Sequence, residues 1–186
     1  MKIKIADLVQ IHTGIYAKPQ PDGEVFYIQA RHFDKHREFL PSVKADLPGD
    51  IKLKKHYLAI GDVIVACKGY DHFAVAYKGV IKPAVASSMF IVLRIENTNL
   101  LLPEFLAWFI NDSSTQNILL ALSKGTSLPS ISKSDIGNLE ISIPPVTKQK
   151  SIIKIQLLQK KATDIQKQIG TLKKQYIQQL ILNTLK

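Results

Sequence analysis

The sequence predicts an α+β protein, with a compact domain of short strands and few helices over residues 1–145 and one long coiled-coil helix over residues 146–186. Short β-rich runs punctuated by Gly and Pro fill the first part of the chain. After Pro144 and Pro145 there is no further proline, and apolar residues recur at a helical period. The net charge changes at nearly the same place, since residues 148–186 hold nine lysines and one acid, whereas residues 1–147 hold 16 basic and 14 acidic residues.

The compact domain opens with Ile3–Ile11, whose apolar spacing predicts a short strand or a helical turn that ends at Gly14. Residues 40–50 contain two prolines and a glycine and are expected to be irregular. A turn is expected at Gly61-Asp62. Four further segments have the short, apolar and β-branched or aromatic composition of strands: Val25–Gln29, Val63–Ala66, Phe73–Lys78 and Met89–Ile95.

A helical period begins after Leu102. Pro103 stands where the first turn of a helix tolerates proline, and four apolar residues follow on one face: Phe105, Leu106, Phe109 and Ile110. Ser113–Thr115 is expected to interrupt this helix, and Gln116–Leu122 is predicted to form a second one.

The segment before the diproline completes the domain. Ser123–Ser134 is expected to be a polar loop, and Asp135–Ile143 is expected to form one more short element. Because proline disfavours helical and strand continuation, Pro144-Pro145 ends that element. The sequence contains no internal repeat and no low-complexity tract.

The long helix carries apolar residues at alternating spacings of three and four, which is the pattern of a coiled coil. This seam has seven apolar or aromatic positions and, after a slip of one residue, an eighth: Ile155, Leu158, Ala162, Ile165, Ile169, Leu172, Tyr176 and Leu180. The f positions opposite the seam hold lysines, namely Lys160, Lys167 and Lys174, and the flanking e and g positions hold only Gln or Lys. One interpretation is an amphipathic helix that packs against its own domain. A helix of roughly 50 Å is too long for this domain to cover, so pairing between molecules through the seam is favoured.

Length and composition exclude several classes of protein. A chain of 186 residues fits one domain of ordinary size plus an appendage. The single cysteine, Cys67, excludes an internal disulfide, and a cytoplasmic location is expected. No segment approaches the run of about 18 apolar residues that a membrane span needs, and the N-terminus lacks the apolar core of a secretory signal. A pI near 9.6 favours nucleic acid or another anionic partner.

Motifs of catalysis are absent from the sequence. It contains no G-x-x-x-x-G-K-[ST], G-x-G-x-x-G or H-E-x-x-H. His32 and His36 are four residues apart, but Asp34 is the only nearby acid, so a basic loop facing solvent or phosphate is favoured over a metal site. Asp71-His72 has no accompanying nucleophile or oxyanion element. No catalytic residue, metal or cofactor is therefore expected, and an unrecognised enzyme site is the weakest alternative.

Six short motifs span nearly the whole chain. From the N-terminus they are Ala6–Val9 with Gly14, Tyr27–His32, Leu58–Val65, Leu102–Leu106, Lys124–Ile131, and Leu139–Pro145 with Gln149. Their order and spacing resemble the DNA specificity subunits of type I restriction-modification systems; Leu58–Val65, for example, resembles the family's L-x-x-G-D-I-L element. The resemblance implies a target recognition domain that binds double-stranded DNA. Methylation and cleavage would belong to separate modification (methyltransferase) and restriction subunits, so this chain is expected to be non-catalytic.

The chain departs from the family in two respects. It carries a single recognition unit, whereas the usual subunit has two, each followed by a helix. Lys148 also stands where an acid commonly precedes the glutamine. The first departure, together with the seam, implies a half-subunit that homodimerises and reads a symmetric, interrupted target across an antiparallel helix pair. The alternative is a truncated specificity chain that docks on a partner subunit without reading DNA.

Three loops carry the cations and small hydrogen-bonding residues that grip phosphate and read base edges. The first basic loop comprises Arg31, His32, Lys35, His36 and Arg37. The second basic loop comprises Lys68, Gly69, Tyr70, Asp71 and His72, with Ser88 expected nearby. The third loop comprises Lys124, Gly125, Thr126 and Ser127. The simpler interpretation of each is an ordinary solvated loop. The role of the f-position lysines remains open: they could contact DNA, bind an acidic surface of a modification subunit, or serve solubility.

Overall fold

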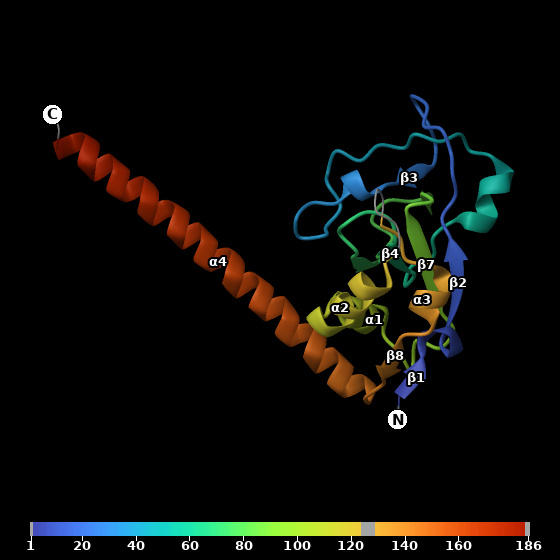
Figure 1. Cartoon of the computed structure of the whole chain (residues 1–186). Helices are drawn as coiled ribbons and strands as arrows, with labels where there is room; N and C mark the ends of the chain where they lie inside the picture. The colour runs from blue at the N-terminus through green and yellow to red at the C-terminus, as the bar shows by residue number, and fades with distance from the viewer. Residues whose placement is uncertain (1, 124–128, 185–186) are drawn as a thin grey trace. The chain divides into compact units, whose positions relative to one another are not determined.

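The computed structural model describes residues 2–123 and 129–184, which form two compact units that divide after Val146. The first unit is a mixed α+β domain and the second is a single long helix (Figure 1), so the expected α+β class is confirmed. None of the helices in these residues combines the length and apolar content that a bilayer crossing requires.

The domain is organised around a four-stranded antiparallel sheet. Its strand order is β2 (Val9–Thr13), β7 (Phe90–Ile95), β4 (Val63–Ala66) and β5 (Ala74–Ala76). β4 has the predicted bounds and all four of its residues are buried, as its continuous apolar run indicates. Among the described strands, β5 pairs only with β4 and lies at the edge of the sheet, so its outer backbone groups need other partners.

Two smaller sheets complete the domain. β1 (Lys2–Lys4) pairs antiparallel with β8 (Glu140–Ser142), and β3 (Phe26–Ile28) pairs in parallel with β6 (Ala84–Ala86). The N-terminal stretch contains both forms that its spacing predicted, since β1 and β2 are strands and η1 (Ile5–Asp7) between them is a 3-10 turn. β6 was not predicted, because three small residues after a proline carry little strand signal.

Three short helices follow the central sheet: α1 (Pro103–Asn111), α2 (Ser113–Leu122) and α3 (Lys133–Gly137). The break between the first two falls at Asp112 rather than at Ser113–Thr115. The Asp112 carboxylate accepts the backbone N–H of Ser114 at 3.0 Å, so the serines form the capped first turn of α2.

The segment after α2 also differs from its prediction. Ser132 caps α3 by accepting the backbone N–H of Asp135 at 3.1 Å, and the Asp135 side chain bonds back to the Ser132 N–H at 2.8 Å. This reciprocal capping box starts a helix inside the expected polar loop. The single element predicted over Asp135–Ile143 is therefore divided between α3 and β8.

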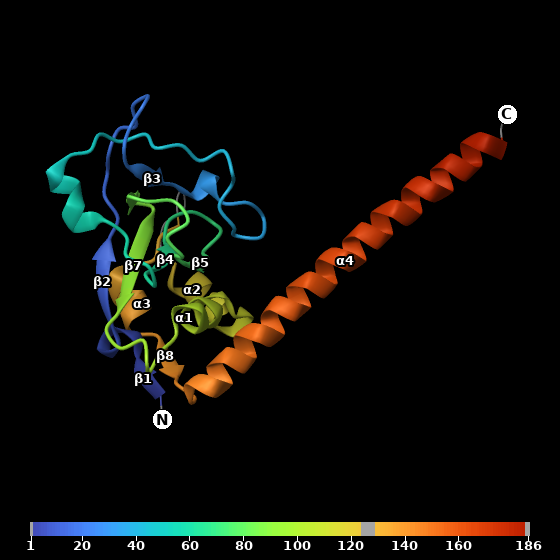
Figure 2. The same ribbon diagram turned by 180° about the vertical axis from the view of Figure 1, so that it is seen from behind.

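The helices pack against the sheet at one end of the domain, and long loops occupy the other end (Figures 1 and 2). α1 contacts β4 and β5, and α3 contacts β2 and η1. In the core, the ring of Phe33 lies 4.5 Å from Phe39, 5.3 Å from Phe73 and 5.9 Å from Phe90, measured between centroids. These aromatic contacts anchor the loop after β3 to the sheet.

Several motif residues have structural roles. Gly14 lies where the chain leaves β2, and a Cβ there would stand 2.0 Å from the carbonyl oxygen of Ser87, so only glycine fits. Gly61 has a φ of +94°, which glycine adopts without steric cost. Asp62 follows it and is 1% exposed, and Arg94 of β7 donates to both of its carboxylate oxygens at 2.8 and 2.7 Å.

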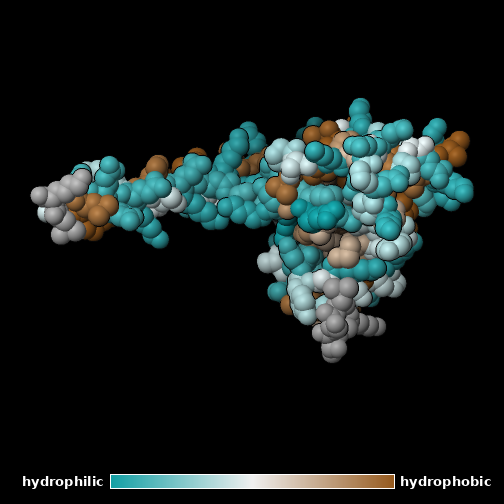
Figure 3. Space-filling model, turned by 90° about the horizontal axis from the view of Figure 1, so that it is seen from above, coloured by the Kyte–Doolittle hydropathy of each residue, from teal (hydrophilic) through white to brown (hydrophobic). Residues whose placement is uncertain are grey.

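The second unit is α4 (Val146–Thr184), a helix of 39 residues and about 58 Å. The large side chains of the seam are between 46% and 66% exposed. Apolar side chains recur along this helix among polar ones (Figure 3). Of the f-position lysines, Lys167 and Lys174 are exposed and Lys160 is half-buried.

Candidate nucleic-acid interface

Three residues of the first basic loop, Lys35, His36 and Arg37, lie at the tip of a short hairpin closed by a bridge between Phe33 and Phe39. The other two, Arg31 and His32, come just before it in the 3-10 turn η2 (Ala30–His32). The Asp34 carboxylate accepts the backbone N–H groups of His36 at 2.8 Å and Glu38 at 2.9 Å. This is how an aspartate stabilises a turn, so Asp34 shapes the loop. Arg37 has a φ of +62°, a left-handed conformation that is unfavourable for residues with a Cβ.

The second basic loop leaves β4 and is fixed by backbone hydrogen bonds. Ile131 donates to the carbonyl of Cys67 at 2.8 Å, and Gly69 donates to the carbonyl of Pro129 at 2.9 Å. The chain that follows the third loop therefore lies beside the second basic loop. The predicted contacts of the third loop fall outside the described residues; they are Lys124, Gly125, Thr126 and Ser127.

The first and second basic loops line one groove of about 340 Å³, called here the loop groove. Its lining residues are Ala30, Phe33, Asp34, Lys35, Arg37, Lys68, Gly69, Tyr70, Asp71 and Phe73. Residues that were predicted in two separate clusters thus come together, on a floor made partly of the aromatic rings that anchor the hairpin.

Five predicted residues do not line this groove. Arg31 is exposed, His32 and His36 are half-buried in the same hairpin, and Ser88 lies in the turn between β6 and β7. His72 is only 3% exposed, and its Nδ1 lies 3.2 Å from the carbonyl oxygen of Ala66. The surface contact expected of His72 is therefore not open to it in this structure.

The groove is close to electrically balanced. Lys35, Arg37 and Lys68 supply three cations, and Asp34 and Asp71 supply two carboxylates. Charge alone attracts a polyanion weakly to such a surface, whereas alternating donors and acceptors suit hydrogen bonds to base edges. The exposed ring of Tyr70, at 76%, adds an aromatic surface on which a base can stack.

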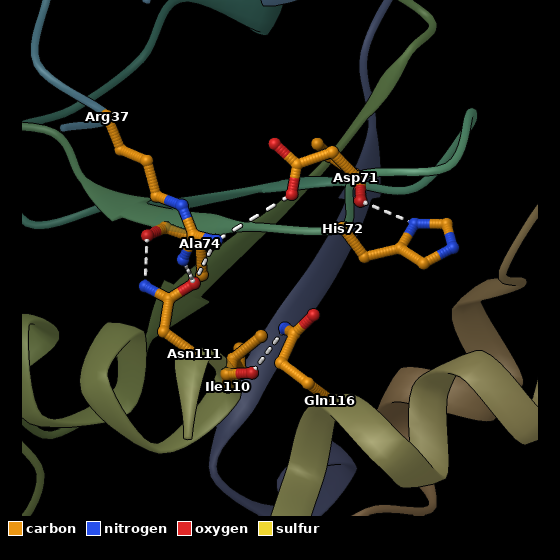
Figure 4. Close-up of polar contacts among 8 residues, drawn as sticks. Arg37, Asp71, His72, Ala74, Ile110, Asn111 and Gln116 are labelled. Carbon is orange, nitrogen blue, oxygen red and sulfur yellow. Dashed lines mark hydrogen bonds and ion pairs between the residues drawn. The ribbon is translucent and has the colours of Figure 1, made fainter. Parts of the chain in front are cut away.

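Arg37 is the most constrained cation of the groove (Figure 4). Its Nη1 donates to Oδ1 of Asn111, its Nη2 lies 3.7 Å from a carboxylate oxygen of Asp71, and its Cζ lies 5.6 Å from the centroid of the Phe73 ring. The side chain is 34% exposed, so the guanidinium is held in place yet still reaches the groove.

Asn111 ends α1 and also holds the edge strand. Its Oδ1 accepts the N–H of Ala74 at 3.0 Å, and its Nδ2 donates to the carbonyl of Ala74 at 2.7 Å. The orientation of the amide is determined by this network, because two donors face the oxygen and a carbonyl faces the nitrogen. One side chain therefore joins a helix, the outer edge of β5 and a groove arginine.

His32 is shifted toward its neutral form. Burial lowers its pKa, the nearby Arg31 lowers it further, and Asp46 opposes them. Its Nδ1 lies 3.3 Å from the backbone nitrogen of Gln29, and its Nε2 lies 3.3 Å from Nε of Arg31. A neutral imidazole can accept only one of these two hydrogen bonds.

Sequence reasoning missed Asn111, Phe33 and Phe73 as groove residues. Asn111 lies 74 positions from Arg37, so no local pattern connects the two. The signal for the phenylalanines was available in part, because Phe33 lies within the first basic cluster and Phe73 directly follows the second. Their shared position became evident only with the hairpin folded.

Other candidate sites are weaker. Within residues 2–123 and 129–184, no three His, Cys, Asp or Glu side chains are arranged to hold a metal ion. A second hollow, lined in part by His12, Lys55, His56 and Arg94, has a volume of about 40 Å³. This is near the size of one water molecule, so it does not admit a base.

A mixed α+β domain that carries a loop groove between two basic loops, followed by one long helix, is the class of protein that these features define. Residues 1–180 match the model of the type I restriction modification DNA specificity domain. The chain therefore belongs to this family, whose members supply specificity rather than catalysis. A search of curated proteins found no match.

Solved structures share the fold. The S subunit of a type I restriction-modification system from M. genitalium matches with a TM-score of 0.59 and 17% identity, over 83% of this chain and 37% of that one. The HsdS subunit from Thermoanaerobacter tengcongensis matches with a TM-score of 0.56 and 17% identity, over 88% and 38%. A chain from a study of complex assembly and conformational transition in the type I R-M system matches with a TM-score of 0.57 and 15% identity, over 88% and 39%. The chain thus spans about two-fifths of the length of each.

Proposed function

We propose that this chain recognises one part of a DNA target in the loop groove and that two copies pair through α4. The observation that carries the first half is the convergence of two basic loops on one groove that contains a constrained arginine. The family of DNA specificity domains supplies the ligand class.

The groove has the features of base reading combined with phosphate contact. Lys35 and Lys68 are flexible cations suited to the backbone, while Arg37 and Tyr70 offer a fixed donor fork and a stacking surface. Of the other three predicted residues of the first loop, Arg31 and His36 are proposed as backbone contacts, and His32 is proposed to shape the loop.

The pairing half of the proposal rests on the seam. The seam exposes a row of isoleucine, leucine and tyrosine side chains at coiled-coil spacing, and exposing this apolar surface to water is unfavourable. Knobs-into-holes packing with a second helix would bury it. A second copy is the favoured partner because it carries the same exposed seam, so each seam would cover the other in a symmetric pair. Two copies would supply two recognition domains.

A homodimer of this kind reads a symmetric target with an unread spacer, because two identical domains at opposite ends of an antiparallel helix pair face inverted half-sites. Modification and restriction subunits are the proposed partners, and they would perform methylation and cleavage at the site that this chain selects. The division proposed is a recognition domain over residues 1–145 and a dimerisation and spacer helix over residues 146–186.

DNA selection by the full chain bound to its modification subunit tests the proposal that the loop groove reads DNA. Binding selection from a random duplex library is expected to enrich one interrupted, symmetric sequence. Enrichment of no sequence, with or without the modification subunit, would leave the alternative of an adaptor that docks on a partner without reading DNA.

The solution mass of the full chain tests the pairing half. The wild-type chain is expected to be a dimer, and the double variant Ile165→Gln, Leu172→Gln is expected to be a monomer because it replaces two apolar seam side chains. The variant Lys160→Gln, Lys167→Gln changes the opposite face of the same helix and serves as the matched control. A wild-type monomer at micromolar concentration would contradict homodimerisation.

A further inference from the structure

The loop groove contains one side chain whose geometry specifies what it can bind. The Arg37 guanidinium hydrogen bonds to Asn111, its Cζ lies over the Phe73 ring at 5.6 Å from the centroid, and its Nη2 lies 3.7 Å from Asp71. The last distance is beyond hydrogen-bond range, so Asp71 acts as a nearby charge and not as an acceptor. A guanidinium has five N–H donors, and among the described residues a single hydrogen bond uses one of them.

This arrangement favours a neutral base edge over a phosphate. A phosphate at Arg37 would bring its negative charge close to the Asp71 carboxylate, which is 79% exposed and would repel it. Guanine presents two acceptors, O6 and N7, without a net charge. A planar fork that is restrained by one amide and lies over an aromatic ring matches those two acceptors, whereas phosphate contact needs no restrained plane.

Asn111 is the group that sets the orientation of the fork. It cannot rotate freely, because Ala74 binds both ends of its amide at 3.0 and 2.7 Å. Oδ1 therefore stays at the end of α1, facing the groove arginine (Figure 4). Without it, the guanidinium would keep the Phe73 ring as a support but would lose its only hydrogen-bonded restraint among the described residues.

We propose that Arg37 selects a guanine in each half-site and that Asn111 is the positioning residue that orients it. The inference rests on the proposed DNA-reading function of the loop groove. It adds the base that is read, the residue that reads it and a helix-terminal residue that supports the reading from outside both basic loops.

Binding selection with variants of the full chain, in complex with the modification subunit, tests this inference. Arg37→Ala is expected to lower the preference for guanine at one position of each half-site by about tenfold to a hundredfold, with other positions unchanged. Asn111→Ala is expected to lower the same preference by about twofold to tenfold, the cost of ordering one long side chain on binding.

Two further variants separate positioning from stability. Asn111→Asp keeps the acceptor for Arg37 and for the Ala74 N–H but loses the donor to the Ala74 carbonyl, so it is expected to be less stable while retaining the guanine preference. Gln116→Ala removes a neighbouring hydrogen bond, from Nε2 to the carbonyl of Ile110 at 2.7 Å, and serves as the control that does not touch Arg37. It is expected to leave the preference unchanged.

The outcomes distinguish this inference from the function on which it rests. No selection by the wild-type complex would remove the DNA-reading function. Selection by the wild type, with Arg37→Ala weakening all sequences equally and making the salt dependence shallower, would make Arg37 a phosphate contact and overturn the guanine assignment. Equal loss of preference in Asn111→Asp and Asn111→Ala would overturn the positioning role.

Discussion

His32 shows how a residue of the first basic loop can act within the loop itself. Its half-buried ring lies at the end of the 3-10 turn η2 (Ala30–His32), within reach of Gln29 and Arg31. Because burial lowers its pKa, His32 is mainly neutral near pH 7 and contributes hydrogen bonding rather than charge. Its removal would therefore affect the shape of the first basic loop more than its attraction for DNA.

The stability of the protein is expected to fall as the pH is lowered from 7.5 to 5.5, in part through His32. Its pKa in the folded state lies below the unfolded value near 6.5, so the unfolded chain binds the proton more readily. The unfolded state is therefore stabilised relative to the folded state as the pH falls through that value. His32→Gln should make the pH dependence shallower in urea unfolding at pH 7.5, 6.5 and 5.5. Some dependence should remain through His56, whose pKa is lowered by burial, Lys55 and His12. An equal slope in His32→Gln and wild type would contradict the assignment to His32.

Among the elements, the turn before β4 is joined to β7 by the Asp62–Arg94 pair. Asp62 is 1% exposed and also accepts the backbone N–H of Ala59 at 2.8 Å, whereas the Arg94 side chain is 39% exposed. The two partners are therefore unequal, because water can reach the arginine but not the carboxylate.

Removing Arg94 is expected to cost more stability than removing the charge of Asp62. Arg94→Met leaves a buried carboxylate without its counter-charge and should lower the free energy of unfolding by about 3 kcal/mol. Asp62→Asn leaves a cation that water can solvate and should cost about 1–2 kcal/mol. Urea unfolding at pH 7.5 measures both, and a larger loss in Asp62→Asn would show that the arginine, not the aspartate, is the buried partner.

Elements with a strong local signal were predictable from the sequence. β4 needed only a continuous β-branched run, and α4 needed only its apolar period. The starts of α2 and α3 were missed because Asp112 and Ser132 act as caps, and polar residues there are equally typical of a loop. β6 has too little local signal, and its parallel pairing with β3 is set by tertiary contacts.

The candidate site was predictable at the level of loops but not of contacts. Composition identified both basic loops, since cations cluster near Arg37 and near Lys68. It did not reveal that His72 is buried, because a histidine after a strand is equally compatible with core and surface. Nor did it reveal Asn111, whose link to Arg37 depends on how α1 packs against β5. The DNA contacts themselves remain predictions.

For the whole molecule, most of the net positive charge lies in the long helix, whereas the groove proposed to read DNA lies in the preceding domain. The residues of the loop groove are nearly balanced in charge, whereas residues 148–186 carry nine lysines against one acid. In the proposed pair of helices the seam faces inward, so the f-position lysines face outward, where they are available to DNA that runs between the two recognition domains. Affinity and selectivity would then be supplied by different parts of the protein.

Neutralising the f-position lysines is expected to weaken DNA binding without changing the selected sequence. Removing one phosphate-binding cation reduces the slope of log K against log salt by about 0.9, so Lys160→Gln, Lys167→Gln, Lys174→Gln should reduce it by up to about three per protomer. The variant Lys154→Gln, Lys161→Gln, Lys173→Gln removes equal charge from beside the seam and should change the slope less, because those positions face the partner helix. DNA titrations of the full chain bound to its modification subunit, at several salt concentrations, measure both slopes. Equal slopes in the two variants would mean that the lysines act only through net charge. An unchanged slope in the f-position variant would mean that these lysines do not contact DNA and would favour a protein partner for that face of the helix.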